Sequence, residues 1–189
     1  FTQMSGIGWY GDLGNFLVMP TIGPMHTNSG KLENPDAGYR SRYDKSSEHA
    51  RAGYYSVYLS DYRIRTEATV AQRAGMLRFT FPKGKDSRIQ IDLARRVGGT
   101  STWQEIKVVD DHTISGKMIC TPDGGGWGNG DGKPDYTVHF YAQFSKPLKD
   151  YGVWSVDIPA GQDRHREFVE SPAFQILTAN AKISERPKA

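Results

Sequence analysis

The stretch that decides the fold is Tyr54-Tyr55-Ser56-Val57-Tyr58-Leu59, followed by the alternating stretches Ile64–Val70 and Met76–Phe81. β-Branched and aromatic residues favour strands, and alternation of apolar and polar residues is typical of a strand with one buried face. We expect a turn at Asp61-Tyr62 and a break at Ala74-Gly75. The sequence therefore predicts consecutive antiparallel strands joined by short turns.

The same rhythm continues on both sides of this region. Further strands are predicted at residues 16–20, 88–93, 105–109, 112–120 and 136–144. Asp110-Asp111 marks a turn, residues 162–170 allow one or two helical turns, and the polar tail from residue 176 to 189 is expected at the surface. Short strands separated by turns every 8–12 residues favour an antiparallel β-sandwich over βαβ units. The expected class is mostly β, an antiparallel β-sandwich with few short helices.

The composition indicates one domain and excludes some classes of function. The chain has 189 residues, with 24 basic and 21 acidic side chains that are interspersed along the sequence. This pattern does not favour a nucleic-acid or membrane surface, and no apolar stretch is long enough to span a bilayer. The single cysteine, Cys120, allows no internal disulfide. Its place in a predicted strand favours a small buried side chain over a nucleophile.

Two glycine-rich loops each carry a tryptophan. The first, Ser5–Gly14, places four glycines around Trp9 and Asp12, and the second places Trp127 after three consecutive glycines. One interpretation of the first loop is a tight turn that leads Trp9 into the core. The other is a rigid loop that presents a flat aromatic face to a sugar. Asp12 could bond sugar hydroxyls or cap amides of its own loop.

No catalytic centre is evident from the residues. The five histidines lack the spacing of zinc ligands, and His139 lies in an alternating strand. Asp123, Asp131 and Asp135 share a loop, but Lys133 occupies a ligand position of the calcium-loop template. We expect Glu48 and His49 to be surface residues. We therefore predict no catalytic residue and no metal ligand in this chain.

Several stretches together resemble a known family. They are Phe1–Gly6, Trp9–Pro20, Ala52–Leu59, Gly124–Trp127 and Tyr141–Pro147. In this order and spacing, they resemble the N-terminal domain of glycoside hydrolase family 92, the calcium-dependent exo-α-mannosidases. The agreement extends from residue 1 to about residue 160.

The resemblance implies a galactose-mutarotase-like supersandwich that packs on a C-terminal (α/α)6 catalytic domain. The general acid, the general base and most Ca²⁺ contacts would come from that domain, which is absent here. Residues 1–189 would then be a single sandwich domain, truncated at both ends and inactive alone. Trp9 corresponds to the tryptophan that lines the terminal-mannose subsite. Gly11, Asp12 and Trp127 complete the candidate substrate-binding set.

The expected function is therefore the N-terminal portion of an inverting exo-α-mannosidase that contributes substrate-positioning loops. The alternatives are a non-catalytic carbohydrate-binding module and a structural domain of another two-domain glycosidase. The expected partners are a mannose-containing glycan and the catalytic domain of the same protein, with no nucleic acid and no membrane span. The family implies a periplasmic, secreted or cell-surface location.

Overall fold

The computed structural model describes residues 15–30, 33–93, 100–121, 136–154, 176–177 and 181–183. Trp9, Gly11, Asp12, Trp127 and the predicted helical turns at 162–170 lie outside these ranges. The chain divides into two compact units. We call Pro20–Arg88 the meander unit, and Phe1–Met19 with Ile89–Ala189 the sandwich unit. That residues 1–189 form a single domain stays a prediction.

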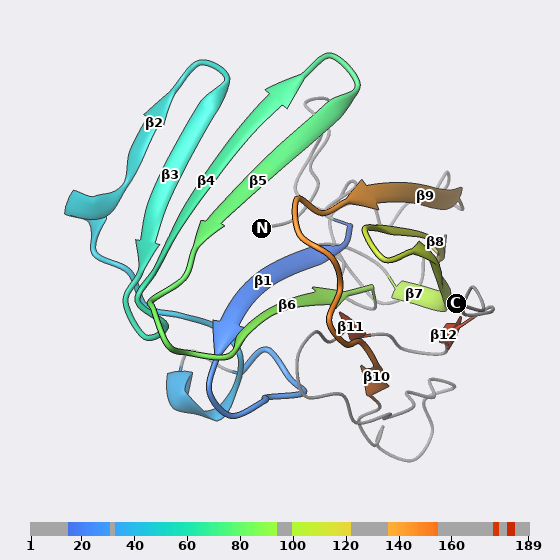
Figure 1. The fold of residues 1–189 in the computed structure, drawn as a ribbon, viewed down its shortest axis with the longest axis horizontal. Coiled ribbons are helices and arrows are strands. Elements are labelled where there is room, and N and C mark those ends of the chain that lie inside the picture. The colour runs from blue at the N-terminus through green and yellow to red at the C-terminus, as the bar shows by residue number, and fades with distance from the viewer. Residues whose placement is uncertain are drawn as a thin grey trace. The chain divides into compact units, whose positions relative to one another are not determined.

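The meander unit contains one four-stranded antiparallel sheet whose strands follow one another in chain order (Figure 1). Its strands are β2 (His49–Arg51), β3 (Tyr54–Leu59), β4 (Ile64–Ala71) and β5 (Ala74–Thr80). The predicted strand 54–59 is confirmed residue for residue, and the turn at Asp61-Tyr62 is confirmed between β3 and β4.

Two details of this sheet differ from the prediction. The break at Ala74-Gly75 was wrong, because both residues lie in β5 and the turn is Gln72-Arg73. Strand β2 was not predicted; it has three exposed residues and no apolar alternation, so only its pairing with β3 defines it.

Alternation sorts the meander sheet into two faces. Val57, Leu59, Ile64 and Thr66 share one face and are buried. The opposite face carries polar partners in register, of which Glu67 and Arg78 form a bidentate ion pair with both bonds at 2.6 Å. The segment that precedes the sheet is irregular apart from two 3₁₀ helices, η1 (Pro35–Ala37) and η2 (Lys45–Ser47).

The sandwich unit contains two sheets, and two of its strands continue into the meander unit. One sheet has the order β1-β6-β11-β10 and the other the order β12-β7-β8-β9. The first comprises β1 (Leu17–Ile22), β6 (Ser87–Asp92), β10 (Val153–Trp154) and β11 (Ile176–Leu177). The second comprises β7 (Thr100–Asp110), β8 (Thr113–Thr121), β9 (Tyr136–Gln143) and β12 (Ala181–Ile183).

The predicted strands of the sandwich unit are confirmed, and the tail contains more structure than expected. β7, β8 and β9 pair antiparallel, whereas the short strands β11 and β12 pair parallel with β6 and β7. The sequence predicted only a polar surface tail from residue 176 onward, so strands β11 and β12 were not predicted. Two or three residues give too short a pattern for period two to be recognised.

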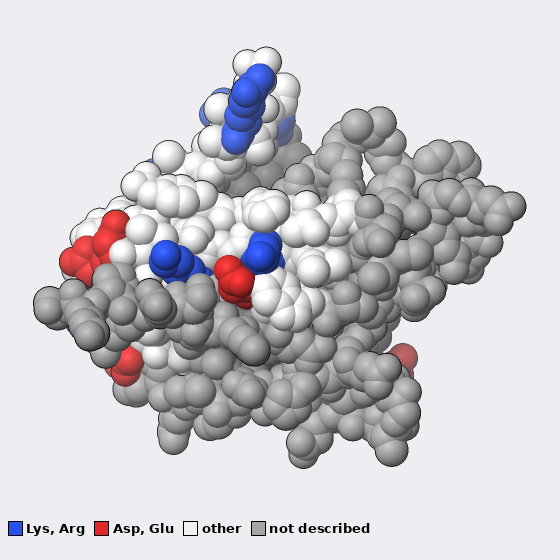
Figure 2. Space-filling view, turned by 90° about the vertical axis from the view of Figure 1, so that its right-hand side faces the viewer, with Lys and Arg blue, Asp and Glu red and all other residues white. Residues whose placement is uncertain are grey.

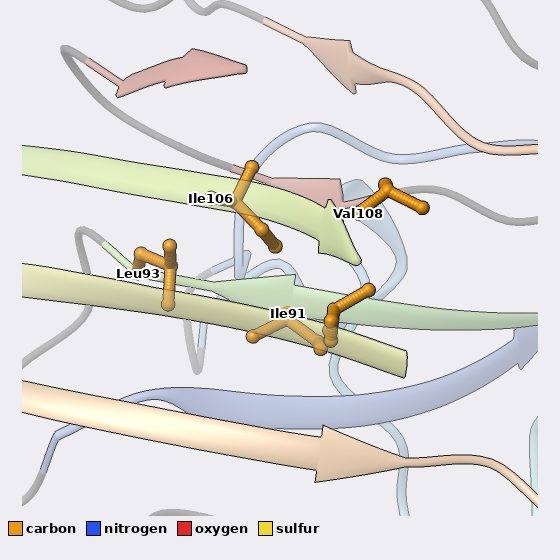
Figure 3. Packing of buried hydrophobic residues seen from close by; sticks show 5 residues of the cluster. Ile91, Leu93, Ile106 and Val108 are labelled. Carbon is orange, nitrogen blue, oxygen red and sulfur yellow. The ribbon is translucent and has the colours of Figure 1, made fainter. Parts of the chain in front are cut away.

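The core of the sandwich unit lies between its two sheets. Ile91 and Leu93, in and just after β6, pack against Ile106 and Val108 of β7 and Ile114 of β8 (Figure 3). Two sheets packed face to face form a β-sandwich, and most strand pairs in the described part of the chain are antiparallel. The predicted fold class is thus confirmed.

Candidate functional site

The two glycine-rich loops that were predicted to carry the tryptophans end beside each other. The first leads into Asn15, whose side chain is fully buried, and the second leads into Tyr136 at the start of β9. The Tyr136 hydroxyl donates a hydrogen bond to Asn15 Oδ1 at 3.4 Å. Residues 121 positions apart in the sequence therefore bring the C-terminal ends of both loops together.

Strand register shows that this place is one end of the β7-β8-β9 sheet. Thr100 pairs with Thr121, and Cys120 pairs with Tyr136. β7 therefore begins where β8 ends and β9 begins. We call this edge, marked by Asn15, Thr100, Thr121 and Tyr136, the loop end of the sandwich unit. Loops at one end of a rigid sandwich are a common place for binding residues.

Aromatic packing fixes the base of the loop end. The rings of Phe16 and Phe140 lie with their centroids 5.1 Å apart and tilted by 59°. Phe140 in turn covers Gly116 of β8, where a Cβ atom would lie 2.6 Å from Phe140 Cε1 and would also meet the carbonyl oxygen of Glu105. Glycine at this position thus allows Phe140 to lie flat across β8.

The backbone of Phe16 is strained where the first loop joins the sheet. Its φ is 44°, in the left-handed region that bulky side chains rarely adopt. Such a conformation costs on the order of 1–3 kcal/mol and persists only where the surroundings enforce it. The ring contact with Phe140 and the start of β1 at Leu17 lie directly beside this strained residue.

Chain length allows both tryptophans to reach the loop end. Trp9 precedes Asn15 by six residues, and Trp127 precedes Tyr136 by nine. At about 3.5 Å per extended residue, chain length alone limits the Cα atoms of Trp9 and Trp127 to at most roughly 20 Å and 30 Å from those of Asn15 and Tyr136. The anchors therefore permit Trp9, Gly11, Asp12 and Trp127 to share one site.

Among the other acidic candidates, Asp110 has a structural partner, whereas Asp123, Asp131 and Asp135 lie outside the described residues. Asp110 Oδ1 accepts a 2.8 Å hydrogen bond from the His112 backbone N–H, which lowers the pKa of Asp110. A turn joins β7 and β8 as predicted, but it comprises Asp111 and His112, one residue later than expected, because Asp110 still pairs with Thr113. His112 itself lies in this turn rather than in the predicted strand, and its Nδ1 is 2.8 Å from the Phe144 carbonyl oxygen.

Among the described residues, Glu48, His49 and His139 form no hydrogen bond or ion pair with another candidate residue. His49 and His139 are exposed, as expected for surface residues. Glu48 is only partly exposed, and its Oε1 accepts a 2.6 Å hydrogen bond from the Tyr55 hydroxyl. Burial and this carboxylate together raise the pKa of Tyr55 to about 12. Glu48 therefore supports the meander sheet.

Neither a cluster of metal ligands nor a membrane-spanning helix is found among the described residues. Within the ranges that the structure describes, no group of three or more His, Cys, Asp or Glu side chains is arranged to hold a metal ion. In the same ranges, no helix is long and apolar enough to cross a membrane. Figure 2 shows charges of both signs scattered over the described part of one face, in agreement with the interspersed charges of the sequence.

Comparison with known proteins gives one consistent result. Residues 1–180 match the family model described as the glycosyl hydrolase family 92 N-terminal domain. Two solved structures of a family GH92 α-mannosidase from Bacteroides thetaiotaomicron are similar, one of them in complex with mannoimidazole. Each has 38% sequence identity and a TM-score of 0.67, and the match covers 75% of this chain and 18% of that chain. No curated protein matches this sequence.

Proposed function

Because this chain belongs to glycosyl hydrolase family 92, of which it carries the N-terminal domain, we propose that the full-length protein is an exo-α-mannosidase. The observation that carries the proposal is the family match over residues 1–180, together with 38% identity to a solved α-mannosidase. The chain spans about a fifth of the length of that relative, so the proposed activity belongs to a longer polypeptide.

Within that enzyme, this domain positions the substrate. Trp9 presses its ring against the apolar face of the terminal mannose, and Gly11 permits close approach of the backbone. Asp12 bonds sugar hydroxyls or holds its own loop, and Trp127 approaches from the second loop. The bond between Tyr136 and Asn15 supports this arrangement, because it joins the ends of both loops.

Proton transfer is assigned to the partner domain. Hydrolysis with inversion needs a carboxylic acid that protonates the leaving oxygen and a carboxylate that activates water, about 6.5–9.5 Å apart. The candidate carboxylates of the described chain, Asp110 and Glu48, are engaged in structural hydrogen bonds. Ca²⁺, also proposed from the family, would be held mostly by the partner domain, because the described residues contain no cluster of three or more His, Cys, Asp or Glu side chains arranged for a metal ion. A periplasmic or secreted location completes the proposal.

The proposal is tested by Trp9→Ala in the full-length enzyme, with kcat/KM measured on an α-mannoside. We expect a loss of about tenfold or more, which corresponds to 1.4 kcal/mol of transition-state binding. Trp103→Ala is the matched control, because Trp103 lies on strand β7 and its ring centroid is 4.8 Å from Lys117 Nζ. Trp9→Phe should retain most of the activity.

The outcomes separate the alternatives. Unchanged kcat/KM in a folded Trp9→Ala enzyme would remove the subsite role while leaving the mannosidase activity intact. Binding of mannosides by the full-length protein without hydrolysis would favour a carbohydrate-binding module. Hydrolysis by residues 1–189 alone would contradict the assignment of acid and base to another domain.

A further inference from the structure

The far end of the β4–β5 hairpin exposes apolar side chains on both faces. Val70 is 70% exposed and Leu77 is 37% exposed on one face, and Met76 is 68% exposed on the other. Register places them close together near the turn, because Ala68 pairs with Leu77, Thr69 with Met76 and Val70 with Gly75. We call residues 68–77 the hairpin end; Figure 1 shows it as the turn between β4 and β5.

The Met76 face contains a shallow hollow with apolar walls. It measures about 160 Å³ and is lined by Tyr54, Glu67, Ala68, Thr69, Met76 and Arg78. Both carboxylate oxygens of Glu67 are already bonded, Oε1 to Tyr54 and Arg78 and Oε2 to Arg78. The Thr69 hydroxyl donates to the Gly53 carbonyl at 2.7 Å. The hollow thus suits an apolar side chain better than a ligand that needs hydrogen bonds.

Apolar groups on both faces are unusual at a free end of a sheet. An antiparallel sheet with one buried face keeps its other face polar, and contiguous exposed apolar groups mark interaction surfaces. In the described part of the chain, β5 is also the edge of its sheet. Its outer backbone groups can pair with another segment. A hairpin with exposed apolar side chains on both faces can bury them only against a partner that covers both faces.

We propose that the hairpin end inserts into an apolar groove on the polypeptide that the full-length enzyme carries beyond this domain. The proposal rests on the proposed function, because the solved relative has most of its chain outside the 18% matched here. A large neighbouring surface within the same polypeptide is therefore the occupant best supported. One apolar side chain of that surface fills the hollow beside Tyr54 and Met76.

Methionine oxidation in the full-length protein tests this proposal without any mutation. Hydrogen peroxide converts an accessible methionine to its sulfoxide, and mass spectrometry gives the rate at each position. We expect Met76 to react at least tenfold more slowly than in the unfolded protein, close to the rate of the fully buried Met118. A Met76 rate equal to the unfolded rate would overturn the proposal.

A dilution series and two variants identify the occupant. Protection of Met76 that disappears on dilution would assign the surface to a second copy and overturn the proposal. Val70→Asp combined with Leu77→Asp should restore rapid oxidation of Met76. Thr80→Asp, at an exposed position of β5, should not change the oxidation rate of Met76. The oxidation rates of Met76 do not depend on hydrolysis of a mannoside. A negative result for the hairpin end can therefore be distinguished from a negative result for the mannosidase proposal.

Discussion

Gly116 determines the packing beneath the loop end, because glycine has no side chain and leaves space for a neighbouring ring. Its neighbours in the antiparallel register are Ile106 on β7 and Phe140 on β9. With no Cβ, the β8 backbone leaves room for the Phe140 ring, which then meets Phe16. The sequence shows only a glycine that interrupts a predicted strand. Glycine is required there because of the Phe140 ring, 24 residues later in the chain, and the sequence around Gly116 does not show this contact.

The first prediction follows from this contact. Gly116→Ala would place a Cβ atom against Phe140 and the Glu105 carbonyl oxygen, so either the ring or the strand must shift. We expect a loss of about 1–3 kcal/mol of unfolding free energy, typical of overpacking, measured by denaturant titration. Gly75→Ala is the matched control, because its nearest neighbour to a new Cβ is a backbone oxygen at 4.0 Å. Equal stability of the two variants would contradict this account.

At the scale of elements, the sequence predicted strands well where alternation was long. β9 alternates in burial along all eight residues and β4 at its start, and the six residues of β3 are rich in aromatic and β-branched side chains; all three strands were found. β2, β11 and β12 have only two or three residues and depend on pairing with distant partners. The wrong break at Ala74-Gly75 has a similar cause, because the real turn, Gln72-Arg73, lacks glycine and proline.

Cross-strand contacts of the meander sheet form a polar network that sequence alone could not pair. Tyr54, Glu67 and Arg78 come from β3, β4 and β5, and Glu67 receives hydrogen bonds from both partners. Alternation places each on a polar face, but only register makes them neighbours. Arg78 and then Tyr54 lower the pKa of Glu67 to about 2.

The pKa of Glu67 leads to a prediction for acid stability. A carboxyl whose pKa is lower in the folded state stabilises the fold above its unfolded pKa of about 4.5, and this contribution disappears as pH falls through about 2. Glu67→Gln should therefore melt at a lower temperature than wild type at pH 7, with the gap closing between pH 4.5 and 2. Glu105→Gln, which breaks a longer 3.8 Å ion pair with Lys117, should show a smaller gap at pH 7. A gap that does not change with pH would disprove the ionic role.

At the scale of the whole molecule, sequence reasoning named the candidate loops but could not bring them together. Trp9 and Trp127 were recognised by glycine-rich context and family resemblance, and their own positions stay a prediction. The meeting of the loop ends depends on Asn15 and Tyr136, which belong to different predicted elements. Neither residue carries a local signal for this contact, since the neighbouring sequence of each does not show which distant residue it meets.

The junction of the two loops supplies the last prediction. Tyr136→Phe in the full-length enzyme removes the hydroxyl that bonds Asn15 Oδ1 and keeps the ring. If both loops contribute to one mannose subsite, we expect kcat/KM on an α-mannoside to fall by about 2- to 10-fold, the value of one hydrogen bond, mainly through KM. Tyr141→Phe is the control, because Tyr141 lies on the same strand and is exposed. A Tyr136→Phe enzyme as active as the Tyr141→Phe enzyme would show that the two loops act independently, and Trp9 would then position the sugar without help from Trp127.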